Sequence, residues 1–375
     1  MTQFSIPCSV YRGGTSRGLF FHEKDLPQDE TARNNIFLQG IDAYNLSQIN
    51  GLGSGTSHSS KVVAIGTTGV QINYTFYQIG IGTPTVDDKG TCGNLMAAVG
   101  AFAVNEGLVD VDPAAKEIKV LVYNTNVNMH LQINVPVENG EAKVVGDYLM
   151  PGIVTPGAKF EVDILNPGGG KTGKTLPLGL SSTIKNYHVS FVDVVNPFVF
   201  VAADMLGLSG KEQIGEVSGN EQLMKEVNGI RDEAAVSVGL AETIEEAKTK
   251  SPAIPKISIV AKAQDYITTS GKQIKKDEID IVAKMLSMGK VHRTFAGSGL
   301  YNLAAATLLP GTIPNQVAGL KNIEKNQIIR IGHPDGIAEV RVSLTEDQKD
   351  VLSVGLDRTA RQIMKGEIFI PKNVE

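Results

Sequence analysis

The stretch 91-TCGNLMAAVGAFAVNEG-107 carries the strongest structural signal in the chain. Residues 95–104 are apolar on every side, which is typical of a helix buried in a core rather than one lying on a surface. Gly107 is a natural helix stop. Cys92, one of two cysteines in the chain, comes just before the apolar run. The stretch therefore predicts a central buried helix with a thiol at its N-terminus.

A second stretch of the same kind occurs at 295-FAGSGLYNLAAATLLPG-311. It is also small and glycine-rich at its start and apolar afterwards. Each of the two stretches is followed by two strand-like segments around a turn, at residues 118–135 and 328–344. Such a pattern predicts a hairpin of two strands. A buried helix opened by glycine and followed by a hairpin thus occurs twice, which indicates an internal duplication.

The other segments predict strands and surface helices. Residues 62–66 and 70–80 are rich in β-branched and aromatic residues and predict strands. Residues 26–41 predict a short surface helix, and residues 220–240 predict an amphipathic helix. Residues 277–288, DEIDIVAKMLSM, also carry apolar residues at helical spacing, so we expect a further amphipathic helix there.

These elements predict an α+β fold with two similar lobes, each a curved, mostly antiparallel sheet wrapped around a central buried helix. We place the N-terminal lobe at residues 1–180, completed by the tail 362–375, and the C-terminal lobe at residues 181–361. Interfaces between lobes are favoured ligand sites. The duplication therefore predicts a cleft between the lobes that holds the functional site.

Composition limits the classes of function. Hydrophobic residues make up 42% of the 375 residues, so a packed core is expected. The net charge of −5 and the lack of a basic stripe argue against a nucleic-acid partner. The chain has no apolar run long enough to cross a membrane and no secretion signal at its start. Two widely separated cysteines fit a reducing compartment, so we expect a cytoplasmic protein.

The stretch 168-GGGKTGKT-175 matches the phosphate-loop pattern but lacks its context. That pattern requires a buried strand before the loop and a helix after it. Residues 159–165 alternate between apolar and polar, as a half-exposed strand does, and Pro177 falls where the helix should run. We therefore expect a glycine-rich connection between the lobes and no nucleotide site.

The chemistry is expected where the two apolar helices begin. A helix N-terminus offers unpaired N–H groups and a positive dipole end, and glycine lets a carboxylate approach the backbone. Gly93 and Asn94 at the first helix, and Gly297 and Ser298 at the second, are thus predicted carboxylate ligands. Thiols at such positions ionise readily, so Cys92 is a candidate for proton transfer. The alternative is a cysteine that is merely buried.

Other candidates lie in loops and turns. Lys61 stands where a serine-rich loop enters an apolar strand, and desolvation there would make its amine a usable base. Most lysines are simply solvated, and that alternative stays open. Thr15 and Ser16 lie in a glycine turn and are either carboxylate ligands or parts of an ordinary hairpin. Cys8, in a strand-like stretch, is expected to be a core residue.

The histidines complete the list of candidates. His292 directly precedes the second glycine-opened helix, and His333 lies in the turn GHPDG. The duplication places both near the expected cleft, as substrate ligands. The other histidines show no metal-ligand spacing, and no cluster of cysteine and histidine occurs, so we expect no catalytic metal.

Several motifs along most of the chain together resemble the PrpF family of isomerases. They are YRGGTSRGLFF, SSKVVAIG, TCGNLMAAVGAFAVNEGLV, YNTN, GIRDEAAVSVGL, PKISIVAKAQDY, GHPDG and RTARQIMKGEIFIP. The resemblance implies the fold of diaminopimelate epimerase, with two pseudosymmetric lobes and an active site between them. In that epimerase each glycine-opened helix starts with a cysteine. Here Ala296 stands at the second position, which speaks against a two-thiol mechanism.

The resemblance implies Lys61 and Cys92 as the acid–base pair, working without a cofactor. Family members move a double bond in a small anionic unsaturated carboxylate such as 2-methylaconitate, methylitaconate or 4-oxalomesaconate. Two other functions remain as alternatives: a cofactor-independent racemase or epimerase, and an accessory protein that binds a metabolite for a partner enzyme. The sequence leaves open the oligomeric state, with a homodimer or a homotetramer as candidates.

Overall fold

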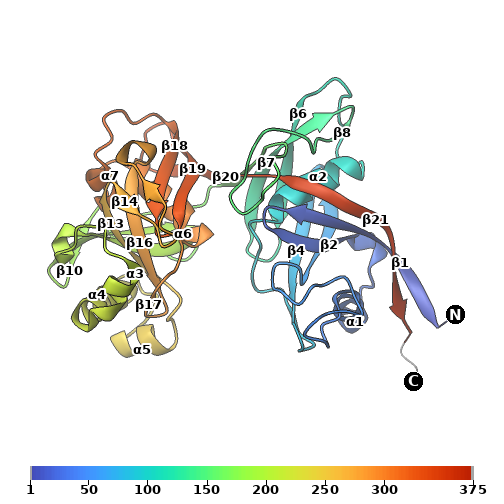
Figure 1. Ribbon diagram of the computed structural model, residues 1–375, viewed down its shortest axis with the longest axis horizontal. Coiled ribbons are helices and arrows are strands. Elements are labelled where there is room, and N and C mark those ends of the chain that lie inside the picture. The colour runs from blue at the N-terminus through green and yellow to red at the C-terminus, as the bar shows by residue number, and fades with distance from the viewer. Residues whose placement is uncertain (1, 373–375) are drawn as a thin grey trace. The chain divides into compact units, whose positions relative to one another are not determined.

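The computed structural model describes residues 2–372. Two compact units are present (Figure 1). Unit 1 takes in the chain up to Ile164 and again from Asp357 onward, and unit 2 is Leu165–Leu356. The chain passes from one unit to the other in strands β9 (Phe160–Leu165) and β20 (Val351–Arg358). The sequence placed these divisions near residues 180 and 361.

Unit 1 is a mixed sheet built from hairpins. Its strands lie in the order β21-β1-β2-β3-β4-β6-β7-β9, with β5 beside β4 and β8 beside β7. The neighbours β2–β3 and β4–β6 are parallel, whereas β1–β2, β3–β4 and β6–β7 are antiparallel. The strands are β1 (Gln3–Gly13), β2 (Ser16–His22), β3 (Lys61–Thr68), β4 (Gln71–Ile79), β5 (Val86–Asp87), β6 (Glu117–Asn124), β7 (Met129–Glu138), β8 (Glu141–Ala142) and β21 (Ala360–Pro371).

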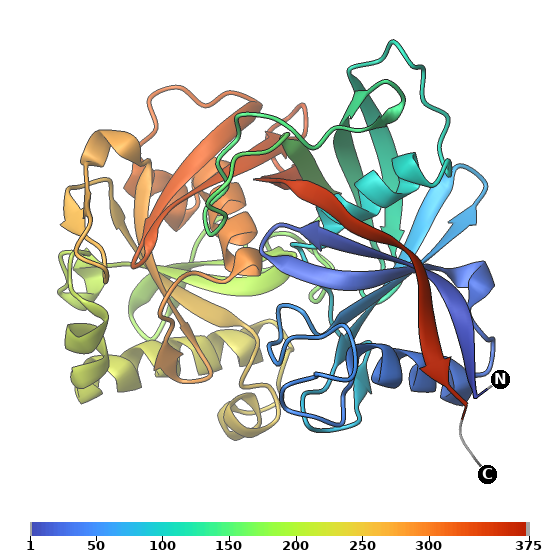
Figure 2. The ribbon, with the colours of Figure 1, turned by 45° about the vertical axis from the view of Figure 1, so that its right-hand side comes forward.

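The first and the last strand of the chain pair in unit 1. β21 runs antiparallel to β1 from Gln3↔Pro371 to Gly13↔Ala360, and the two strands lie side by side in both ribbon views (Figures 1 and 2). The tail thus adds an edge strand to the N-terminal sheet. A 3-10 turn, Glu23–Asp25, follows β2.

Helix α2 (Met96–Asn105) is the buried helix that the sequence predicts. Every residue from Met96 to Val104 is buried, which explains why the run has no polar face. The surface helix α1 (Glu30–Ile41) is also confirmed, and Asp29 caps it by accepting from the N–H of Ala32. The prediction of a half-buried β9 is confirmed by its alternating burial.

Unit 2 repeats the plan of unit 1. Its strands lie in the order β10-β11-β12-β13-β16-β18-β19-β20, and the neighbours β12–β13 and β16–β18 are the parallel ones. The strands are β10 (Ser182–Ile184), β11 (Tyr187–Val194), β12 (Asn196–Ala202), β13 (Lys256–Lys262), β16 (Ile281–Ser287), β17 (Lys290–Val291), β18 (Asn326–His333) and β19 (Gly336–Leu344), with β14 (Tyr266–Ile267) and β15 (Gln273–Ile274) as a separate small ribbon.

The helices of unit 2 confirm two predictions. Helix α6 is buried after its first turn, as α2 is, and α4 is amphipathic with Leu223, Val227, Ile230 and Ala234 buried. The helices are α3 (Ile214–Gly219), α4 (Glu221–Ser237), α5 (Ile244–Thr249), α6 (Gly297–Leu308) and α7 (Ile313–Ala318), with 3-10 turns at Asp204–Leu206 and Lys276–Glu278. None of the helices in residues 2–372 has the length and apolarity needed to span a bilayer.

The predicted duplication is visible in the strand order. Each unit contains three antiparallel hairpins, and each hairpin pairs with the next one through two parallel strands. In both units the buried helix comes before the third hairpin. The predicted α+β class, with a mostly antiparallel sheet around a central helix in each unit, is confirmed. Two units of the same plan agree with the two-lobed fold that the family resemblance implies.

The predicted amphipathic helix at residues 277–288 is wrong. Most of this segment is β16, which pairs with β13 on one side and β18 on the other and is buried along almost its whole length. A strand covered on both faces shows no apolar–polar alternation, so its short apolar run looks like a helix to a periodicity test. The duplication makes β16 the counterpart of β4.

The loop 168–175 is folded around one carboxylate. Asp193, at the end of β11, is fully buried, and its Oδ2 accepts hydrogen bonds from Lys171 N, Thr172 N and Thr172 Oγ1 at 2.7–2.9 Å. The backbone N–H of Gly169 bonds the Asp193 carbonyl. Donors that a phosphate loop would offer to a nucleotide thus bind a side chain of the protein itself.

Replacing Asp193 with alanine is expected to lower the free energy of unfolding by about 2–4 kcal/mol, since it leaves several donors without their charged acceptor. Urea unfolding of the purified variant measures this loss. Asp204→Ala is the matched control in the same unit, because its exposed carboxylate accepts one backbone N–H. Equal unfolding midpoints for the two variants would contradict a structural role for Asp193.

Candidate functional site

Lys61 is the first residue of β3 and is only 8% exposed. Its neighbour across the β3–β4 hairpin is Gln78, whose Oε1 accepts a hydrogen bond from Lys61 Nζ at 2.6 Å. The ring of Phe76, two residues back on the same face of β4, lies 5.0 Å from Nζ. Desolvation lowers the pKa of the Lys61 ammonium, and the charge of Cys92 raises it again by a smaller amount.

Cys92 is 9% exposed and comes directly before the turn that leads into α2. Its thiol donates toward Ser16 Oγ at 3.7 Å, which ties it to the start of β2. A charge on the Cys92 sulfur raises the pKa of the Lys61 ammonium, so the two groups lie within electrostatic range of each other. Unit 1 therefore brings together the two residues that the sequence proposed as the acid–base pair.

The glycine turn between β1 and β2 receives Asn94. Asn94 Nδ2 donates to Thr15 Oγ1 at 3.0 Å. A Cβ atom at Gly13 would lie 2.6 Å from the carbonyl oxygen of Asn94, and one at Gly14, which has φ +52°, would lie 2.4 Å from its side-chain oxygen. Only glycine allows the turn and the start of α2 to approach this closely. Thr15 and Ser16 of the turn thus meet Cys92 and Asn94 at the start of the helix.

The sequence reasoning missed three polar side chains that support this site, namely Asn124, Asn126 and Gln78. Asn124, at the end of β6, donates to both Tyr74 Oη and Thr91 Oγ1, and Tyr74 and Thr91 bond each other at 2.8 Å. Thr91 is the residue before Cys92, so this network fixes the approach to the thiol. The signal was present in the motif YNTN, whose polar residues stand at the end of a strand.

Asn126, in the same motif, uses its side-chain amide to bond the backbone of Phe76 in β4, as a neighbouring strand would. Its side chain accepts from Phe76 N at 2.8 Å and donates to Phe76 O at 2.9 Å and to Asp88 O at 2.7 Å. It thereby joins the strand that carries Gln78 to the loop that leads to Cys92. The third missed residue is Gln78 itself, which the two-residue turn between β3 and β4 places opposite Lys61.

In unit 2 two of the predicted ligand positions lie close to one another. His292 donates its backbone N–H to Met285 O at 2.8 Å, and Ala296, the N-cap of α6, donates its N–H to Met285 Sδ at 3.2 Å. Gly297 and Ser298 form the first turn of α6. Met285 therefore holds His292 beside the start of this helix.

His333 is the last residue of β18, which pairs with β16 on the same edge that His292 approaches. It lines a small space together with Tyr266 and Lys284, and Tyr266 Oη donates to its backbone carbonyl at 2.8 Å. Burial lowers the pKa of His333, and the nearby Asp335 opposes this shift. The substrate-binding roles of His292, Gly297, Ser298 and His333 stay predictions from the sequence.

Cys8 and Cys92 occupy very different surroundings. Cys8 is buried in the apolar cluster between β1 and α1, and this burial raises the pKa of its thiol to about 12. The predicted core role of Cys8 is confirmed. Within residues 2–372, no group of three or more histidine, cysteine, aspartate or glutamate side chains is placed to hold a metal ion.

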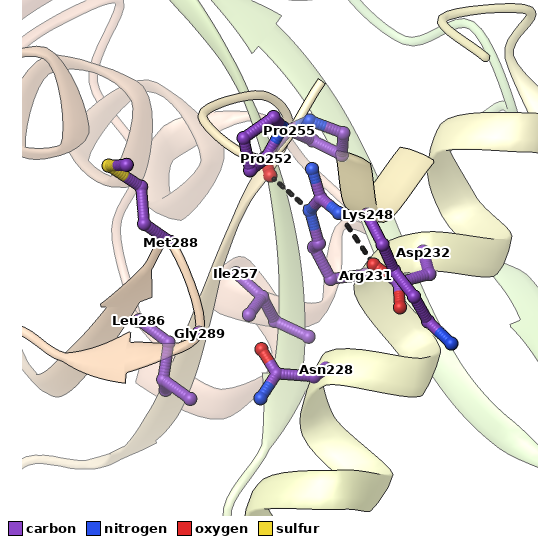
Figure 3. Close-up of a pocket in the computed structure, with 10 residues that line it drawn as sticks. All are labelled: Asn228, Arg231, Asp232, Lys248, Pro252, Pro255, Ile257, Leu286, Met288 and Gly289. Atoms are coloured by element: carbon purple, nitrogen blue, oxygen red, sulfur yellow. Dashed lines mark hydrogen bonds and ion pairs between the residues drawn. The ribbon is translucent and has the colours of Figure 1, made fainter. Parts of the chain in front are cut away.

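A pocket of about 280 Å³ lies in unit 2, between α4, the segment 248–255 and the β16–β17 turn (Figure 3). Arg231 of the motif GIRDEAAVSVGL borders it. Its guanidinium donates to Asp232 and to the carbonyls of Ala247, Ser251, Ile254 and Pro255. The dashed contacts in Figure 3 show it turned toward Asp232 and Pro255. This arginine therefore clamps the segment to α4 and is not free to bind an anion.

The surroundings of Lys61 and Cys92 suit proton transfer. A desolvated amine can take a proton from carbon, and a thiol tied to a serine hydroxyl can return one. Backbone N–H groups at the start of α2, together with Asn94 and Thr15, can bind a carboxylate. One unit thus holds groups that can act as a base, as an acid and as ligands of an anion.

Comparison with known proteins agrees with this description. Residues 3–371 match the model of the family described as PrpF protein. The chain is 38% identical to 3-methylitaconate isomerase of Eubacterium barkeri, covering 99% of this chain and 98% of that protein. It is 31% identical to 2-methyl-aconitate isomerase of Shewanella oneidensis, covering 99% and 98%.

A solved structure shows the same fold. The crystal structure of methylitaconate-delta-isomerase is similar with a TM-score of 0.92 and 35% sequence identity, covering 99% of this chain and 97% of that chain. The match to the family model, the two relatives and this structure all extend over nearly the whole chain. The chain therefore belongs to the PrpF family of isomerases, as its sequence motifs implied.

Proposed function

We propose that this protein is a cofactor-independent isomerase that shifts a double bond in a small unsaturated di- or tricarboxylate. The observation that carries the proposal is the placement of Lys61 near Cys92 in unit 1, where Cys92 contacts Ser16 and Asn94 contacts Thr15. We take Thr15, Ser16 and Asn94 as ligands of the substrate carboxylates. The relatives named as methylitaconate and methylaconitate isomerases support this substrate class. We include 4-oxalomesaconate as a third candidate substrate of the same chemistry.

The reaction begins with removal of an allylic proton. The neutral amine of Lys61 takes this proton from the carbon next to the double bond and becomes an ammonium ion. The electron pair left behind spreads over the allyl system into the conjugated carboxylate. Charge that develops on this carboxylate is stabilised by N–H groups that already point at it, such as those at the start of α2.

The reaction ends with protonation at the other end of the allyl system. Cys92 gives its thiol proton to that carbon and becomes a thiolate. The pair then consists of an ammonium ion and a thiolate, and transfer of one proton from Lys61 to Cys92 restores the starting state. In the reverse direction the thiolate is the base and the ammonium ion is the acid, so one pair serves both directions.

The test is a panel of unsaturated acids incubated with the purified protein, with chelator present and no cofactor added. Proton NMR in D₂O should show interconversion of double-bond isomers of 2-methylaconitate, methylitaconate or 4-oxalomesaconate. The Lys61→Ala, Cys92→Ala double variant serves as the control for contaminating enzymes. No interconversion of any member would overturn the proposal, and racemisation of amino acids instead would indicate an epimerase.

The predicted cytoplasmic location is part of this proposal. Both cysteines are free thiols, as a reducing compartment favours. Fractionation of cells that produce the protein, followed by immunodetection, tests the location.

A further inference from the structure

Gln78 has the contacts expected of a residue that serves the catalytic amine. It lies opposite Lys61 in the β3–β4 hairpin, and directly opposed residues of an antiparallel pair have neighbouring side chains. The contact between Gln78 Oε1 and Lys61 Nζ, at 2.6 Å, is at the short end for a hydrogen bond.

The NH₂ group of Gln78 fixes the orientation of the side-chain amide. Its Nε2 donates to Ser60 O at 2.8 Å and lies 3.4 Å from Ser57 O. Both of these partners are backbone carbonyls, which only accept hydrogen bonds. Turning the amide over would set its oxygen against them, so the oxygen must face Lys61.

An amide in this position holds the lysine without adding a charge. Carboxylates next to a lysine favour the ammonium form and thereby remove the base, whereas the amide oxygen of Gln78 does not. The neutral amine uses one N–H for Gln78, which leaves its lone pair free for a substrate proton. The face of Phe76 then stabilises the ammonium ion that forms.

We propose that Gln78 is a positioning residue that directs the Lys61 amine at the substrate while keeping the site free of a second negative group. Cys92, from the turn before α2, is the ionisable group that acts on the pKa of Lys61. β4 contributes the neutral side chains of Gln78 and Phe76, and β5 places the exposed Asp87 opposite Gln78, one strand further from Lys61. This inference rests on the proposed function, since it takes Lys61 as the base.

The test compares Gln78→Glu, Gln78→Leu and the matched control Gln71→Glu, which introduces the same charge at the far end of β4, opposite Thr68. Gln78→Glu should move the rise of kcat/KM with pH upward by about 1–3 pH units, because an adjacent carboxylate favours the ammonium form. Gln78→Leu should lower kcat at every pH by about 10- to 100-fold without an upward shift, and Gln71→Glu should leave the profile unchanged.

Two results would overturn the role of Gln78. One is a pH profile of Gln78→Glu that coincides with the wild-type profile. The other is a kcat of Gln78→Leu within about twofold of the wild-type kcat, a change no larger than an ordinary surface substitution causes. The thermal unfolding midpoint of each variant shows whether it is folded.

A direct titration separates this inference from the proposed function. In protein labelled with carbon-13 at the lysine ε-carbon, the Lys61 signal is the one that disappears in Lys61→Arg. Its pKa should be higher in Gln78→Glu than in the wild type. If no acid of the panel is turned over but this pKa rises, the proposed function fails and the contact stands. If the wild type is active and the pKa does not move, only the role of Gln78 fails.

Discussion

Replacing Lys61 with alanine is expected to lower kcat/KM for the isomerisation by about 10²- to 10⁴-fold, the usual contribution of one positioned base. The amine is nearly buried and tethered to Gln78, so water cannot substitute for it at the same place. Steady-state rates on the active member of the acid panel measure the loss. Lys119→Ala, an exposed lysine on β6 of the same unit, is the matched control and should keep wild-type rates.

The pH dependence provides a second check on Lys61. As a base it must be neutral, so kcat/KM should rise with pH as the ammonium loses its proton. Because desolvation lowers the pKa of Lys61 from 10.5, the rise should come below that value in the wild type. The rise should be absent from the residual activity of Lys61→Ala. Wild-type rates in this variant would show that another group removes the proton.

Replacing Cys92 with alanine is the second large effect that we expect, again about 10²- to 10⁴-fold in kcat/KM. Cys92→Ser should be nearly as inactive, because a hydroxyl gives up its proton far less readily than a thiol does. Cys8→Ala is the matched control. It removes the other thiol from the apolar core and should affect stability but leave the rate unchanged.

Chemical modification distinguishes the two thiols without mutation. Iodoacetamide should label Cys92 and inactivate the protein, and a bound unsaturated diacid should slow this labelling. Cys8 should stay unlabelled in the folded protein, because apolar side chains enclose it and burial raises the pKa of its thiol to about 12. Peptide mass spectrometry reads both sites. Full activity of protein labelled at Cys92 would remove the thiol from the mechanism.

Much of the fold could be predicted from the sequence because its signals are local. The run 95–104 is apolar on every side, which only a buried position tolerates, and the same pattern at 299–308 revealed the duplication. The error at residues 277–288 came from reading one short apolar run alone. A strand with both faces covered loses its alternation, and only comparison with the corresponding strand in the first half, β4, would have corrected it.

One part of the site was within reach of the sequence but was missed. Gly69 and Val70 form a two-residue connection between β3 and β4, and Gly69 has φ +60°. Such a turn fixes the register of a hairpin. Counting outward from it pairs Lys61 with Gln78 across the two strands. The local turn therefore determines the cross-strand partner of Lys61.

The sequence by itself determined the buried helix, the hairpins, the candidate residues and, through its motifs, the family. Each of these follows from residue type and spacing over a few turns or strands. Only the tertiary structure decided that Cys92 bonds Ser16, that Asn94 enters the glycine turn, and that Asn124 and Asn126 support the site. These contacts join segments far apart in the chain, and their partners depend on sheet order and close backbone approach, which no local pattern encodes.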